Sequence, residues 1–118
     1  MSLCLLAAGK LTVLAVSAFT LSWTHSVEKT RWEESWQVTP QGLVTTSARV
    51  EGSGAGMEPP PGAVFDGSGW RYEPDLPSQQ RLVLADSGTA GAWRLCAGDR
   101  CMSLGGGDQG PIALESCR

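Results

Sequence analysis

At residues 18–27 the sequence reads Ala-Phe-Thr-Leu-Ser-Trp-Thr-His-Ser-Val, in which polar and apolar side chains alternate without a break. Successive side chains point to opposite faces of a β-strand, so this alternation predicts a strand with one buried face. The apolar face carries Phe19, Leu21, Trp23, His25 and Val27. The single histidine of the chain is therefore expected on the apolar side of a strand.

Short apolar runs separated by turn residues continue along the rest of the chain. Thr39-Pro40-Gln41-Gly42 is typical of a tight turn, and it joins the predicted strands 32–39 and 43–50 into an antiparallel meander with 18–27. Hairpins are predicted for 3–16, 64–72 and 93–104, and short strands for 82–85 and 112–117. No segment has the 3.6-residue apolar period of a helix. The sequence therefore predicts an all-β fold, a small antiparallel β-sandwich or partly open barrel built from hairpins and a meander.

The length of 118 residues is that of a single domain, which we assign to residues 1–118. A net charge of -3 and the lack of any run of lysines or arginines argue against nucleic-acid binding. Lys10 interrupts the apolar stretch 3–18, so no transmembrane segment is expected. Residues 11–18 end in Val-Ser-Ala, which is typical of a signal-peptide cleavage site, but we favour a β-hairpin there.

Four cysteines are present, an even number that fits two disulfides. Cys96 and Cys101 flank a predicted two-residue turn at Gly98-Asp99, which would place them opposite each other on a hairpin, within reach of a disulfide. Two reduced core thiols are the alternative for this pair. A second bridge, between Cys4 and Cys117, would require the first and last strands to be neighbours.

The topology of the predicted meander also places two polar segments together. If strands 18–27, 32–39 and 43–51 alternate in direction, residues 25–31 and the glycine-rich loop after residue 51 meet at one end of the sheet. This rim gathers His25, Ser26, Glu28, Lys29, Arg31, Glu33, Ser53, Gly54 and Gly56. Exposed backbone N–H groups in such a loop can hold a small anion. The structural alternative is that the glycines serve only the turn and that His25 is a hydrogen-bonded residue at the core edge.

The residue types also allow three other functions. A small hydrolase would use His25, the single histidine, as its general base, with a serine or cysteine from another strand as nucleophile, and a lysine base is the alternative. A zinc module could be built from His25 with Cys96, Cys101 and Cys117, although the Cys-x4-Cys spacing is not that of a structural zinc knuckle. The five tryptophans are interpreted as packing residues, and a sugar-stacking platform is the alternative. No cofactor is expected.

The stretch from Phe19 to Thr30, followed by Trp32-Glu33-Glu34, resembles the signature of the DUF1850 family of bacterial and archaeal proteins. Gly52-Ser53-Gly54-Ala55-Gly56 is similar to the second block of that family, with Ser53 at a position usually held by an aromatic residue. Gly69-Trp70 and Leu82-Val83-Leu84 fit its later pattern. The family also has a strand pair before its first block, which agrees with the hairpin at 3–16.

The resemblance implies a function only by association. Genes of this family often lie beside permeases of TRAP transporters of the TAXI type, and many members carry an export segment. We therefore expect a non-enzymatic accessory domain in the periplasm that binds a transporter subunit or a small anionic ligand. A cytoplasmic location is the alternative.

Overall fold

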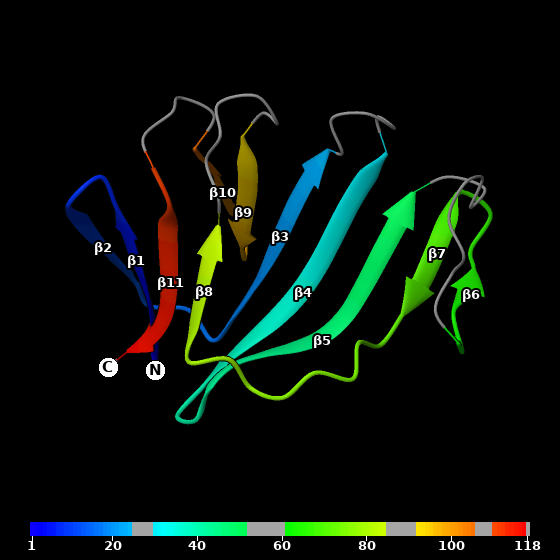
Figure 1. Cartoon of the computed structure of the whole chain (residues 1–118), viewed down its shortest axis with the longest axis horizontal. Helices are drawn as coiled ribbons and strands as arrows, with labels where there is room; N and C mark the ends of the chain where they lie inside the picture. Colours follow the sequence, from blue (N-terminus) through cyan, green and yellow to red (C-terminus); the bar gives the residue numbers. More distant parts are fainter. Residues whose placement is uncertain (25–29, 52–60, 85–91, 106–109, 118) are drawn as a thin grey trace.

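The computed structural model describes residues 1–24, 30–51, 61–84, 92–105 and 110–117, and every regular element in these ranges is a β-strand (Figure 1). The strands are β1 (Ser2–Ala7), β2 (Lys10–Leu14), β3 (Ala18–Thr24), β4 (Arg31–Thr39), β5 (Gly42–Glu51), β6 (Val64–Phe65), β7 (Gly69–Tyr72), β8 (Arg81–Leu84), β9 (Trp93–Ala97), β10 (Arg100–Leu104) and β11 (Ile112–Cys117). The all-β prediction is confirmed. No helix in these ranges is long and apolar enough to cross a membrane.

The strands form two antiparallel sheets. One has four strands in the order β2-β1-β11-β8, and the other has seven in the order β10-β9-β3-β4-β5-β7-β6. Within the described residues each sheet ends in two edge strands, so neither sheet closes on itself. Of the two architectures that the sequence allows, the fold is therefore the sandwich of two open sheets and not the partly open barrel.

The meander of β3, β4 and β5 lies at the centre of the larger sheet, as the sequence predicts. The hairpin between β4 and β5 turns at Pro40-Gln41, where the Thr39 hydroxyl donates to the Gly42 carbonyl at 2.8 Å. Arg31, which the sequence places in a connection, is the first residue of β4 and pairs with Thr24. The predicted extension of β3 to residue 27 lies outside the described residues.

The hydrophobic core lies between the two sheets. Phe19, Leu21, Trp36 and Leu95 from the larger sheet pack in one cluster with residues of the smaller sheet, namely Leu3, Leu5, Leu84, Ile112 and Leu114. Burying a leucine of this kind contributes about 1.5–3 kcal/mol relative to leaving it exposed. One face of each sheet is therefore an inner face, and the opposite face is directed outward.

Both disulfides that the sequence offers are present. Cys96 and Cys101 are directly opposite each other on β9 and β10, with Cα atoms 4.1 Å apart. Cys4 and Cys117 are bridged with Cα atoms 5.9 Å apart, because β1 pairs with β11. The N-terminal and C-terminal strands thus lie side by side in the smaller sheet (Figure 1).

Candidate functional site

The rim expected from the sequence is described only in part. Arg31 and Glu33 lie on β4, at the end of the larger sheet. The other seven rim residues, namely His25, Ser26, Glu28, Lys29, Ser53, Gly54 and Gly56, lie outside the described residues. The rim as a whole therefore remains a prediction, and so does the hydrolase hypothesis, which depends on His25.

The strand ends around the rim can be placed. Thr24, the last residue of β3, is opposite Arg31, and Trp32 on β4 is opposite Val50 near the end of β5. The end of β3, the start of β4 and the end of β5 consequently lie at the same end of the larger sheet (Figure 1). This is the arrangement of strand ends that the predicted rim requires.

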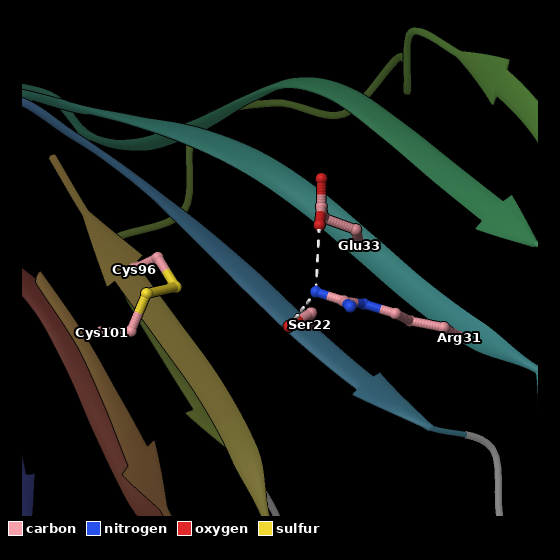
Figure 2. Close-up of a disulfide and its surroundings, with 5 residues drawn as sticks. All are labelled: Ser22, Arg31, Glu33, Cys96 and Cys101. Carbon is pink, nitrogen blue, oxygen red and sulfur yellow. Dashed lines mark hydrogen bonds and ion pairs between the residues drawn. A yellow bond between two sulfur atoms is a disulfide. The ribbon is translucent and has the colours of Figure 1, made fainter. Parts of the chain in front are cut away.

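Arg31 lies across the outer face of the larger sheet, toward Ser22 and Glu33 (Figure 2). Its Nη2 atom is 3.5 Å from the Ser22 hydroxyl oxygen and 3.5 Å from a carboxylate oxygen of Glu33. The Arg31 side chain is 49% exposed, whereas Ser22 is only 6% exposed. A guanidinium has five N–H donors in a fixed planar fork, so these two long contacts orient the group and leave donors for another acceptor.

A second arginine, Arg94, flanks Ser22 on the other side. Ser22 on β3 is opposite Glu33 on β4 and opposite Arg94 on β9, so all three share the outer face. Arg94 is exposed, and no ion pair engages it among the described residues. We call Ser22, Arg31, Glu33 and Arg94 the arginine surface.

The sequence predicts only part of the arginine surface, namely Arg31 and Glu33 as rim residues. Arg94 lies far from Arg31 in the sequence, and only the pairing of β3 with β9 brings it beside Ser22. The alternation within 18–27 places Ser22 on the face opposite Phe19 and Leu21. It could not show which strand lies next to that face, because β3 and β9 are distant along the chain.

The Cys96–Cys101 disulfide lies on the same outer face, next to the arginine surface (Figure 2). Cys96 is two residues from Arg94 on β9, and it is opposite Thr20 on β3. The disulfide therefore joins the strand that carries Arg94 to its hairpin partner β10. It also removes Cys96 and Cys101 as thiolate ligands, as the second disulfide removes Cys117, so the zinc set is not available while both bonds are intact.

Two arginines on either side of a serine hydroxyl form an arrangement suited to an anion. Arginine pairs with carboxylates and phosphates through parallel N–H donors, and such charge-assisted bonds are about twice as strong as neutral ones. Glu33 offsets part of the positive charge through an exposed ion pair with Arg31 at 3.5 Å. The surface can therefore hold a carboxylate, whether on a small molecule or on an acidic side chain.

The fold and this surface define a small, disulfide-bonded β-sandwich domain with a candidate anion-binding face. The model of a family described as "Domain of unknown function (DUF1850)" matches residues 19–104, and the chain belongs to that family. The match extends from β3 to β10 and so includes the larger sheet, whereas β1, β2 and β11 lie outside it. The chain has no match among curated proteins or among solved structures.

Proposed function

We propose that this chain is a non-enzymatic accessory domain of a TRAP-type solute transporter, and that it binds a carboxylate at the arginine surface and the adjoining rim. The carboxylate belongs either to a small anionic ligand or to an acidic side chain of a transporter subunit. The observation that carries the proposal is the placement of exposed Arg31 and Arg94 on either side of Ser22.

Two further features support the proposal. The chain as a whole has a net charge of -3, so the arginine surface is a local positive region on an acidic protein. A local field of this sign attracts and orients an acidic partner. The two disulfides favour an oxidising compartment such as the periplasm, where the binding components of TRAP transporters operate.

The transporter arm of the proposal is tested by co-purification. The tagged chain, expressed with its disulfides intact, is incubated with native membranes, and the permease is quantified in the eluate. We expect the wild-type chain to retain the permease and the variant Arg31→Ala/Arg94→Ala to retain at least tenfold less. Truncation of one partner of a charge pair in an interface typically costs several kcal/mol when the pair is buried there.

The matched control is Arg81→Ala. Arg81 is also an exposed arginine in a single ion pair, with Glu115 at 2.6 Å, but it lies on β8 in the smaller sheet. Retention of the permease should be unchanged in this variant. Equal losses in Arg81→Ala and in the double variant would mean that the interaction depends on overall charge and would contradict the proposed surface.

The small-anion arm is tested on the purified chain with succinate as the probe. We expect saturable binding by calorimetry that weakens as salt is added and that is lost in Arg31→Ala/Arg94→Ala. If neither succinate binding nor permease retention depends on these two arginines, the proposed function is wrong.

A further inference from the structure

The larger sheet has an inner face that gathers the five tryptophans of the chain. Trp23 on β3 is opposite Trp32 on β4. Val50 on β5 is opposite both Trp32 and Trp70, which lies on β7. Trp93 contacts Trp23 with ring centroids 4.7 Å apart, and Trp36 follows Trp32 on the same face of β4. Trp36 is buried in the core, whereas Trp32 and Trp70 are only half-buried.

Three buried polar atoms on this inner face have no hydrogen-bond partner: Trp32 Nε1, Thr45 Oγ1 and Trp70 Nε1. No other buried side-chain nitrogen or oxygen in the described part of the chain lacks a hydrogen-bond partner. The three atoms lie on the neighbouring strands β4, β5 and β7. A buried donor or acceptor left unpaired costs about 1–3 kcal/mol. Each of these atoms calls for a partner, which water, residues outside the described ranges or a ligand can supply.

A carboxyl group lies among these atoms. Glu34 is two residues from Trp32 and two from Trp36, and one of its oxygens accepts a hydrogen bond from Trp36 Nε1 at 3.3 Å. Desolvation by burial raises the pKa of Glu34 above its usual value, and the Trp36 hydrogen bond opposes that rise.

Tyr72 on β7 and Glu34 on β4 lie on opposite sides of β5. Glu34 and Tyr72 are both opposite Ala48, whose small side chain leaves little between them. The pKa of Tyr72 is raised by burial and also by the charge of Glu34, as expected for two groups that face the same space. Glu34 and Tyr72 therefore form a row across Ala48 that adjoins the row of Trp32 and Trp70 across Val50, which sets a carboxyl and a hydroxyl beside the two indoles.

The donor and acceptor inventory selects one ligand class. A cationic ligand would pair with Glu34 and the aromatic faces, but it would leave both indole N–H groups without an acceptor, because indoles only donate. An anionic ligand would accept from the indoles but would be repelled by the Glu34 carboxylate. A neutral sugar offers hydroxyl groups that both donate and accept, together with apolar C–H faces that pack on aromatic rings. It is a class that can pair with both indole N–H groups, with the Glu34 carboxyl and with the Tyr72 hydroxyl.

We infer that the inner face of β4, β5 and β7 binds a neutral carbohydrate, with Trp32, Glu34, Trp70 and Tyr72 as its contacts. The rings of Trp32 and Trp70 are half-exposed, and each already contacts one other ring, Trp23 at 6.1 Å and Phe65 at 5.2 Å between centroids. The sugar packs on the part of each ring that these contacts leave open, and a side-chain rotation brings each N–H to a sugar hydroxyl. This site is on the opposite face of the sheet from the arginine surface and is independent of the proposed function. It takes up the sugar-stacking interpretation of the tryptophans, here limited to two of the five.

The test uses the five indole N–H resonances in a ¹H–¹⁵N spectrum of the whole oxidised chain, each assigned by a Trp→Phe variant. Glucose, galactose, maltose and cellobiose are titrated separately, with choline and succinate as cationic and anionic probes. We expect at least one of the four sugars to shift the Trp32 and Trp70 resonances in a saturable way. Choline and succinate should leave these two resonances in place.

Two variants separate this site from general packing. Trp70→Phe keeps an aromatic ring but removes the donor, and it should weaken sugar binding by about five- to tenfold. Trp93→Phe, on β9 beyond Trp23, should leave the affinity unchanged. The inference is overturned if none of the sugars shifts these resonances in the folded chain. It is equally overturned if choline or succinate shifts them in place of the sugars, or if both variants bind sugar like the wild type.

Discussion

Asp66 accepts several hydrogen bonds in the turn between β6 and β7. Arg49 Nε donates to one carboxylate oxygen at 2.8 Å, and the backbone N–H groups of Ser68 and Gly69 donate to the other at 3.1 and 2.9 Å. The hydrogen bond from Arg49, followed by the one from the Ser68 backbone, lowers the pKa of Asp66 well below its usual range. The charged carboxylate therefore favours the folded state.

This arrangement predicts the acid behaviour of the chain. Because the pKa of Asp66 is lower in the folded state than in the unfolded one, its contribution to stability is present above the ordinary value of 3.8. The contribution is lost progressively as the pH falls below that value. Urea unfolding of Asp66→Asn should show lower stability than wild type at pH 7 and a smaller difference at pH 2. A difference that stays constant over this range would contradict the role given to the charge.

The residues of the candidate site differ in how far the sequence could place them. The Cys96–Cys101 pair is predictable from the sequence because a local turn fixes which residues are opposite each other. Arg31 and Glu33 were assigned to the rim from the direction of neighbouring strands. Arg94 and the environment of Glu34 were not predicted, because they depend on pairing and burial between strands that local patterns do not specify.

At the scale of elements, the hairpins follow from their turn residues. The alternation of side chains and the positions of glycine and proline predict the hairpins β1–β2, β4–β5, β6–β7 and β9–β10 to within about two residues. Hairpins are predictable because their hydrogen bonds join residues that are close in the sequence. The pairings of β3 with β9 and of β11 with β8 join strands that are far apart in the sequence. Such pairings are set by the packing of whole faces, and one sequence carries no signal for them.

The turn between β4 and β5 requires a glycine at position 42. Its φ of +130° is disfavoured for other residues, and a Cβ there would lie 2.6 Å from the backbone oxygen of Gln79. Leu43 and Gln79 exchange two backbone hydrogen bonds of 2.7 and 2.8 Å beside it, which join β5 to the segment that leads into β8.

Gly42→Ala should therefore destabilise the chain by about 2 kcal/mol or more, since it combines backbone strain with a collision. Gly98→Ala is the control. Gly98 also has a positive φ, of +62°, but nothing lies within 4 Å of an added Cβ. Thermal unfolding should show a clearly larger loss for Gly42→Ala. If the two losses were equal, the contact with Gln79 would have no part in the effect.

At the scale of the whole molecule, the two sheets differ in how much of each lies within the family match and in the disulfide that joins the ends of the chain. The larger sheet lies within the matched residues 19–104, whereas three strands of the smaller one lie outside them. The Cys4–Cys117 disulfide spans 113 residues and closes the smaller sheet around its central β1–β11 pair. The core therefore includes residues near both ends of the chain, such as Leu3 and Leu114.

Removal of this disulfide in Cys4→Ser/Cys117→Ser should lower the free energy of unfolding by about 3–5 kcal/mol, because the bond restricts a long loop of the unfolded chain. Removal of Cys96 and Cys101 should cost less, since their separation is only 5 residues. Denaturant titrations of both double variants test this order. The reverse order would mean that the smaller sheet does not depend on its covalent closure.

We propose that the arginine surface links this domain to solute uptake. The most direct measurement is the uptake rate of the transporter in cells that lack the native copy of this chain and are complemented with wild type, Arg31→Ala/Arg94→Ala or Arg81→Ala. We predict that wild type and Arg81→Ala restore uptake and that the double variant, present at the same level in the same compartment, does not. Full uptake with the double variant, or unchanged uptake when the chain is absent, would contradict the claim.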